Sequence, residues 1–171
     1  ALKVDFKPEV IVATDDNQIK KISENSGVKS YLTSRDNENG TERILEILDQ
    51  IDAEFIINLQ GDEPLVNPID LNNLYSEIKS SNADIVSICH EVDNLDAENP
   101  SNVKVVFDNN QNALYFSRSK IPYGAKNFFC HQGIYAFKKQ ALEKIKGLNY
   151  SALGNYEDLE QLKWLENKMS I

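Results

Sequence analysis

The chain has 171 residues, of which 41% are hydrophobic and 26% are charged, and its formal net charge at pH 7 is −9. This composition is typical of one folded domain, and no apolar run approaches the roughly 18 residues that a membrane span needs. Because an acidic surface repels phosphate backbones, broad nucleic-acid binding is not expected. We therefore expect a small-molecule partner, with no nucleic acid and no membrane.

The two cysteines, Cys89 and Cys130, form no CxxC motif and predict no disulfide framework. Together with the absence of a signal-peptide pattern, they favour a cytoplasmic location. The two histidines, His90 and His131, are too few to predict a zinc site by themselves. The sequence starts at Ala1 without an initiator Met and enters a strand-like segment almost at once, so we expect that it begins within a fold.

Strands and helices alternate along the first half of the chain. Short apolar runs predict strands, and apolar residues at helical spacing predict helices. Asp16 is a candidate N-cap of the first helix, and Gly27 a candidate C-cap. The expected elements are a strand at 9–14, a helix at 18–25, a strand at 28–33, a helix at 41–51 and a strand at 55–59.

The second half continues the pattern. A helix with proline at its first position is followed by a strand, and a polar segment rich in Asn and Asp predicts a hairpin. The expected elements are a helix at 68–79, strands at 83–89, 103–107, 113–116 and 133–137, and helices at 139–145 and 156–167. We predict one α/β domain over residues 1–171, with a mixed, mostly parallel sheet flanked by helices.

Three polar segments fall where ligands collect in such sheets, at the ends of strands. In the first, Asp62 follows the most apolar strand, and a carboxylate held there suits Mg²⁺, which prefers hard oxygen ligands. Gly61 would let the backbone approach a ligand closely. Gly, Asp and Pro also favour an ordinary turn, so composition alone leaves both readings open.

The other two segments are equally ambiguous taken singly. Asn39 and Gly40 precede a helix whose free N–H groups suit an anionic ligand, although simple capping, with Glu42 in the first turn, explains the same residues. His131 lies just before the predicted strand at 133–137, where a lone histidine is more often structural than a ligand. Glu160 and Gln161 would by default lie on a solvated helix face.

Taken together, these segments resemble the 3-deoxy-manno-octulosonate (Kdo) cytidylyltransferases, also called CMP-Kdo synthetases. The resemblance covers nearly the whole chain in the order of that family, and the pair LQGDEP and ALYFSRSKIPY is its most specific part. The matching stretches are VIVATDD (10–16), NGTERI (39–44), NLQGDEPLV (58–66), NVKVVFD (102–108), NALYFSRSKIPY (112–123), HQGIYAF (131–137) and EDLEQLKWL (157–165).

The resemblance implies a Rossmann-like nucleotidyltransferase fold and a reaction in which CTP and Kdo give CMP-Kdo and pyrophosphate with Mg²⁺, activating the sugar for lipopolysaccharide biosynthesis. It also implies a homodimer, for which the apolar residues of segment 115–123 could serve as the interface. Asp62 and Arg43 would be catalytic, with Asp62 as a Mg²⁺ ligand. The CTP side would comprise Asn39, Gly40, Thr41 and Arg43, and the sugar pocket Gln60, His131, Tyr135, Glu160 and Gln161. Arg118 is a further candidate, although a salt bridge at the end of a strand is an equal alternative.

The sequence departs from the family pattern at several points. It contains no IPARxxSxRxxxKxL-like phosphate-binding loop at its start and no GIDTxEDL-like segment with a second metal ligand at its end. The family loop near Gly124 is usually longer, and Asn37 stands where His is common. We therefore expect the residues to be part of a longer protein.

Two alternatives stay open at this point. One is a cytidylyltransferase for another acid sugar, either 8-amino-Kdo or sialic acid, with the same fold and metal chemistry. HQGIY and EDLEQL favour Kdo over sialic acid but do not distinguish the 8-amino sugar. The other is a non-catalytic binding domain that has lost both ends, which would bind ligands weakly and show no Mg²⁺-dependent turnover.

Overall fold

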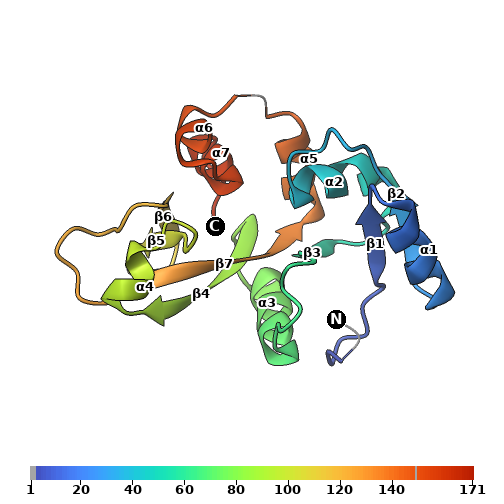
Figure 1. Ribbon diagram of the computed structural model, residues 1–171, viewed down its shortest axis with the longest axis horizontal. Helices are drawn as coiled ribbons and strands as arrows, with labels where there is room; N and C mark the ends of the chain where they lie inside the picture. The colour runs from blue at the N-terminus through green and yellow to red at the C-terminus, as the bar shows by residue number, and fades with distance from the viewer. Residues whose placement is uncertain (1–2, 149) are drawn as a thin grey trace.

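The computed structural model describes residues 3–148 and 150–171 (Figure 1). The expectation about the start of the chain at Ala1 lies outside these residues. At one end of the molecule, β1 (Ile11–Thr14), α1 (Asn17–Asn25) and β2 (Lys29–Leu32) form a two-stranded parallel sheet with its connecting helix. Asp16 caps α1 as predicted, because its carboxylate accepts hydrogen bonds from the backbone N–H groups of Gln18 and Ile19 at 2.6 and 3.1 Å.

The middle of the chain forms a second strand–helix–strand unit. The unit consists of β3 (Phe55–Leu59), α3 (Pro68–Ser80) and β4 (Ile85–Val92). It is preceded by α2 (Gly40–Ile47) and the 3₁₀ turn η1 (Leu48–Gln50). The remaining elements are α4 (Asn94–Glu98), β5 (Lys104–Phe107), β6 (Ala113–Ser117), β7 (Phe128–Lys138), α5 (Lys139–Lys146), α6 (Ala152–Glu157) and α7 (Glu160–Glu166). None of the described helices is long and apolar enough to cross a membrane.

The larger sheet is built around β7, which runs through the middle of the molecule (Figure 1). The predicted α/β fold is confirmed, but the prediction of a mixed, mostly parallel sheet is wrong, because the described strands form two sheets and the larger one is antiparallel. The β1–β2 pair is parallel, whereas β7 pairs antiparallel with β3, β4 and β5, and β5 with β6. The crossover through α3 does make β3 and β4 point the same way, but β7 lies between them and takes their hydrogen bonds.

Several element boundaries also differ from the sequence prediction. Strand β7 starts at Phe128 rather than at residue 133, so His131 lies inside the strand instead of before it. The single helix predicted at 156–167 is two helices, because Asp158 adopts a left-handed conformation with φ 54° and Leu159 is extended. The helix predicted at 41–51 ends in a 3₁₀ turn, and α4 was not predicted.

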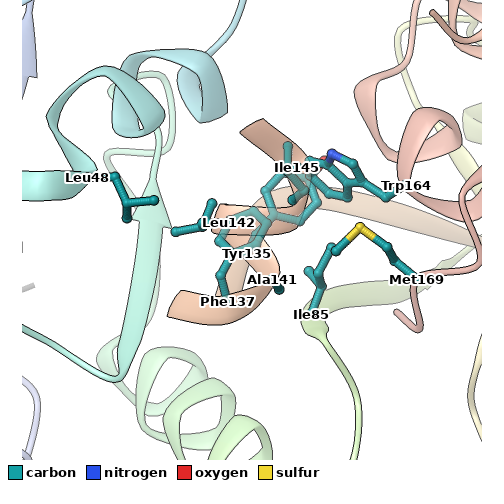
Figure 2. Packing of buried hydrophobic residues seen from close by; sticks show 9 residues of the cluster. All are labelled: Leu48, Ile85, Tyr135, Phe137, Ala141, Leu142, Ile145, Trp164 and Met169. Atoms are coloured by element: carbon teal, nitrogen blue, oxygen red, sulfur yellow. The ribbon is translucent and has the colours of Figure 1, made fainter. Parts of the chain in front are cut away.

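Alternation along β7 divides the core into two layers, since successive side chains of a strand point to opposite faces. Tyr135 and Phe137 pack on one face in a cluster with α5 and α7 that includes Trp164 (Figure 2). Ile134 and Ala136 pack on the other face against apolar residues of α3. The side chains of β7 on the α7 face, His131 among them, are therefore directed toward the segment that carries Glu160 and Gln161.

Candidate active site

A cavity of about 1070 Å³ brings together segments that are far apart in the sequence. It is bordered by the start of α2, the loop after β3, the middle of β7 and the α6–α7 region. Eight of the ten predicted site residues line it, namely Asn39, Thr41, Gln60, Asp62, His131, Tyr135, Glu160 and Gln161. Gly40 and Arg43 are not among the lining residues.

The N-terminus of α2 is tightly fitted against β3. Asn39 caps the helix by accepting a hydrogen bond from the backbone N–H of Glu42 at 2.9 Å. At Gly40, a Cβ atom would come within 3.2 Å of the Asn58 amide nitrogen, so glycine permits this close packing. The Thr41 hydroxyl and the Asn58 amide nitrogen are both buried without a hydrogen-bond partner among the described residues, which leaves unused polar capacity beneath the helix start.

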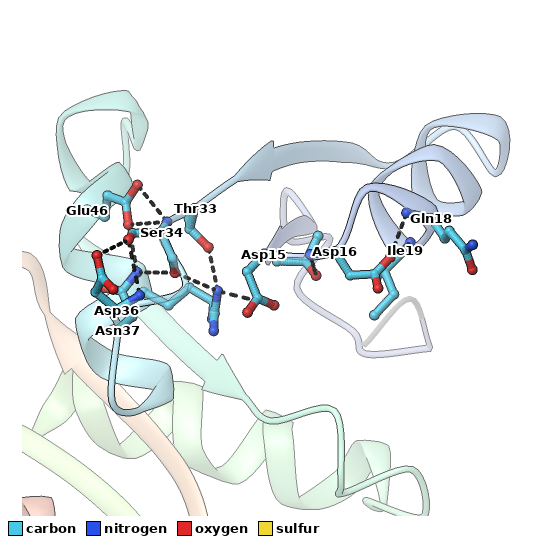
Figure 3. A network of polar contacts seen from close by, with 11 residues as sticks. Asp15, Asp16, Gln18, Ile19, Thr33, Ser34, Asp36, Asn37 and Glu46 are labelled. Atoms are coloured by element: carbon cyan, nitrogen blue, oxygen red, sulfur yellow. Dashed lines mark hydrogen bonds and ion pairs between the residues drawn. The ribbon is translucent and has the colours of Figure 1, made fainter.

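Arg43 faces away from the cavity, toward β1 and the residues that follow β2. Its guanidinium donates to the Thr33 hydroxyl at 2.6 Å and lies 3.7 Å from the Asp15 carboxylate. Figure 3 shows the surrounding network, in which Glu46 accepts hydrogen bonds from Ser34 and Asn37. In this arrangement Arg43 joins α2 to the β1–β2 unit, and its predicted contact with CTP stays a prediction.

The loop after β3 carries the candidate metal ligand. Asp62 is exposed at the cavity, and the neighbouring Glu63 is held to β7 because its carboxylate accepts a hydrogen bond from the Gln132 amide at 3.0 Å. Gln60 lies against Gly133, where a Cβ atom would be 3.5 Å from the Gln60 amide nitrogen. The loop is therefore anchored to β7 on both sides of Asp62, whose carboxylate stays open.

The described residues contain no cluster of three or more His, Cys, Asp or Glu side chains arranged to hold a metal ion. A single open carboxylate still fits Mg²⁺, because this ion usually keeps several waters and binds one or two carboxylates together with substrate phosphates. Asp62 therefore fits a magnesium site that the substrate completes, and does not fit a site made of protein ligands alone.

His131 lies on β7 with both ring nitrogens engaged by the protein. Its Nε2 lies 2.8 Å from the Ser87 hydroxyl on β4, and its Nδ1 lies 3.4 Å from the amide nitrogen of Gln161. Removal from solvent lowers the pKa of His131 to about 4, so the ring is neutral at neutral pH. Both ring nitrogens of His131 therefore have partners in the protein, and its predicted contact with the sugar stays a prediction.

Glu160 and Gln161 begin α7 and line the cavity, and Glu160 lies close to Thr41 and Glu42 of α2. Burial raises the pKa of Glu160 to about 7; the nearby Thr41 hydroxyl lowers this pKa in part, and the Glu42 carboxylate raises it further. Gln161 is only 3% exposed. Burial also raises the pKa of Tyr135 well above its usual value, with a further contribution from Glu160. Both Glu160 and Tyr135 can therefore donate a proton into a hydrogen bond near neutral pH.

The bend between α6 and α7 depends on Glu157, which the sequence analysis did not single out, and on Arg118. The Glu157 carboxylate accepts hydrogen bonds from the Ser117 hydroxyl at 2.7 Å and from the Arg118 backbone N–H at 2.8 Å. The Arg118 guanidinium donates to the backbone carbonyls of Glu157 and Asp158 at 2.7 and 3.0 Å. These carbonyls end α6 and would otherwise lack partners, so Arg118 acts as its C-terminal cap. The only signal in the sequence was the candidate Arg118 at the end of its strand.

Comparison with known proteins places these features in a family. The family model described as cytidylyltransferase matches residues 1–171. The chain is 38% identical to the 3-deoxy-manno-octulosonate cytidylyltransferase of Escherichia coli, over all of the chain and 72% of that protein. It is 39% identical to the enzyme of the same name from Francisella tularensis subsp. novicida, over 95% of the chain and 71% of that protein. A solved CMP:2-keto-3-deoxy-manno-octonic acid synthetase complexed with CTP superposes with a TM-score of 0.94 at 36% identity, covering 99% of the chain and 73% of that structure.

Proposed function

Since the chain belongs to the 3-deoxy-manno-octulosonate (Kdo) cytidylyltransferase family, we propose that it forms CMP-Kdo and pyrophosphate from CTP and Kdo. In this reaction the anomeric hydroxyl of the sugar forms a bond to the α-phosphorus of CTP, and the bond to pyrophosphate breaks. The observation that carries the proposal is the cavity itself, which gathers eight residues predicted for CTP, metal and sugar from four separate segments. Catalysis in such a transfer consists chiefly of alignment and of compensation of developing charge.

The nucleotide side of the cavity is the start of α2. Asn39 fixes the helix terminus, and the buried Thr41 hydroxyl lies beneath it, close to Glu160. Free N–H groups and the helix dipole at such a terminus favour an anionic group. We assign Asn39, Gly40 and Thr41 to CTP, with Arg43 supporting them through its contacts with the β1–β2 unit.

The charge of the cavity lining supports a need for a bound cation. The lining contains six acidic residues and three basic ones: Glu38, Glu42, Asp62, Glu63, Asp158 and Glu160 against Arg118, Lys146 and Lys163. A triphosphate and an acid sugar entering this lining would face net repulsion. Mg²⁺ held by Asp62 would supply positive charge at the phosphates.

The sugar side of the cavity is formed by the loop after β3, by β7 and by the start of α7. Gln60, Tyr135, Glu160 and Gln161 offer both donors and acceptors, as a polyhydroxylated sugar requires. A Glu160 pKa of about 7 lets this carboxyl donate or accept a hydrogen bond near neutral pH. We assign these four residues, with His131 behind them, to Kdo.

A comparison of sugars tests the proposed function. Pyrophosphate release from CTP by the full-length protein would be measured with Kdo, 8-amino-Kdo and sialic acid under the same conditions. Highest kcat/KM with Kdo is expected. Preference for 8-amino-Kdo or sialic acid would reassign the sugar, and no release with any of the three would favour a binding domain without catalysis.

We further propose a cytoplasmic homodimer acting in lipopolysaccharide biosynthesis. Tyr123 and Leu114 are large exposed apolar residues on or next to the 115–123 segment, and such residues favour an interface. The cytoplasmic location follows from the supply of CTP. Light scattering of the full-length protein and of Tyr123→Asp tests the dimer, and a wild-type protein that is monomeric at working concentration would contradict it.

A further inference from the structure

Ser87 lies on β4 directly beside His131, outside every motif that the resemblance identified. It precedes the irregularity in the pairing of β4 with β7, where the register shifts between Ser87 and Ile88. Its hydroxyl oxygen is 2.8 Å from Nε2 of His131, 2.9 Å from the carbonyl oxygen of Ile134 and 3.3 Å from that of Gln132. Three polar atoms of β7 therefore compete for one hydroxyl group.

The hydrogens of this group are assigned from what each atom can donate or accept. A backbone carbonyl can only accept, so we assign the single hydroxyl hydrogen of Ser87 to Ile134, the nearer carbonyl. The oxygen of Ser87 is then the acceptor for His131, which requires a hydrogen on Nε2. In a neutral imidazole the other nitrogen, Nδ1, carries a lone pair and can only accept.

This tautomer dictates the orientation of Gln161. An accepting Nδ1 calls for the amide nitrogen of Gln161 rather than its carbonyl oxygen, which is the orientation found, at 3.4 Å. The Gln161 carbonyl oxygen has no hydrogen-bond partner among the described residues. It is also not among the fully buried polar atoms that lack a partner, so it keeps some exposed surface. Because Gln161 lines the cavity, that oxygen is open to it.

We propose that Ser87 is a positioning residue: it sets the tautomer of His131, and His131 in turn turns the Gln161 carbonyl toward the cavity to accept a hydrogen bond from a sugar hydroxyl. The proposal rests on the proposed function for the identity of the ligand. The hydrogen-bond chain itself is a property of the protein without substrate.

The packing around His131 supports this chain. The ring lies edge-on to Phe116, with centroids 5.1 Å apart, and 5.3 Å from the ring of Tyr135. These aromatic neighbours restrict rotation of the imidazole. A neutral ring with one donor and one acceptor nitrogen matches both of its polar neighbours, the Ser87 hydroxyl and the Gln161 amide nitrogen.

The test reads the tautomer directly. In ¹⁵N-labelled full-length protein, long-range ¹H–¹⁵N spectra distinguish a protonated from an unprotonated ring nitrogen, and His131→Asn assigns the signals. Wild-type protein and Ser87→Thr are expected to show His131 protonated on Nε2 near neutral pH, and Ser87→Ala to lose this uniform state. Protonation on Nδ1 in the wild-type protein would overturn the proposal, whether or not Ser87→Ala folds.

Kinetics then test the link to the sugar. Ser87→Ala is expected to raise KM for Kdo about tenfold, the effect of one hydrogen bond of ordinary strength, with KM for CTP unchanged. Ser87→Thr should restore the wild-type value, and Ser76→Ala, on the exposed side of α3, should have no effect. An equal change in both KM values, or none, would contradict the positioning role. An Nε2–H signal in a protein without turnover would instead contradict the proposed function and leave the hydrogen-bond chain intact.

Discussion

Glu160 is a buried carboxyl group at the candidate site, and its burial makes ionisation unfavourable. Its carboxyl group lies at the start of α7, close to the Glu42 carboxylate, and its pKa is raised from 4.5 to about 7. A raised carboxyl pKa means that the folded protein binds the proton more tightly than the unfolded chain does. Between these two pKa values the free energy of unfolding therefore falls as pH rises.

Glu160→Gln removes this penalty and keeps the shape of the side chain. We expect the variant to become more stable than the wild-type protein as pH rises, with the difference growing by about 2 kcal/mol from about pH 5 to about pH 8. Urea unfolding at several pH values measures it, with Glu143→Gln on the exposed side of α5 as the control. A difference that stays constant with pH would show that Glu160 is not shifted.

Local sequence signals predicted individual residues well where the cause was also local. Asp16 caps α1 and Pro68 begins α3 as expected, because capping and the fixed φ of proline act within one helical turn. The left-handed Asp158 gave no such signal, since glycine or asparagine is the usual residue there. The contact that holds Asp158 in this conformation comes from Arg118, forty positions earlier in the chain, whose guanidinium donates to the Asp158 carbonyl.

The α6–α7 element shows how a distant contact shapes the candidate site. Glu157 and Arg118 hold the end of α6 to the end of β6, and α7 then starts with Glu160 and Gln161 at the cavity. Lys104 adds to the anchor, because its buried ammonium donates to the Arg118 carbonyl at 2.6 Å. The bend therefore determines where the sugar-side residues lie.

Glu157→Gln tests this element. It replaces one carboxylate oxygen with an amide nitrogen that cannot accept a hydrogen bond, so one of the two donors from Ser117 and Arg118 loses its partner. We expect a loss of about 1–3 kcal/mol in unfolding free energy and a larger rise in KM for Kdo than for CTP. Urea unfolding and steady-state kinetics measure these, and wild-type values for both quantities would refute the role of this contact.

The strand pattern was predictable only in part, because strand pairing also depends on contacts between distant segments. The sequence predicted most of the strands correctly, because a run of apolar residues is a local signal of a strand. The polar pair His131 and Gln132 concealed the first half of β7, and the position of β7 between β3 and β4 depends on pairing that no single segment reveals. The predicted site still came together, because its residues were identified by resemblance rather than by sheet order.

Across the whole molecule, stability is expected to be uneven. Strand β7 pairs with β3, β4 and β5 and contributes Ile134, Ala136 and Phe137, all fully buried. The β1–α1–β2 unit has only two strands, and α1 buries none of its residues. A two-stranded sheet with little buried surface opens more easily than a strand paired with three others.

Native-state hydrogen exchange measures this contrast. Amides of β7 are expected to exchange slowest, near the rate of global unfolding, whereas those of α1 and β2 should open with a free energy lower by roughly 2 kcal/mol or more. Ligand binding at the start of α2 should narrow the gap, because Arg43 links α2 to this unit. Equal protection in both regions would contradict this account of the fold.

The most direct test of the central claim is pyrophosphate release from CTP and Kdo by the full-length protein, with and without Mg²⁺, in the wild-type protein and in Asp62→Ala. Asp62 is exposed and makes no hydrogen bond or ion pair among the described residues, so its loss should leave folding unchanged. We predict Mg²⁺-dependent release by the wild-type protein and a loss of at least about a hundredfold in kcat/KM for the variant. Release that is independent of Mg²⁺, or undiminished in Asp62→Ala, would contradict the account.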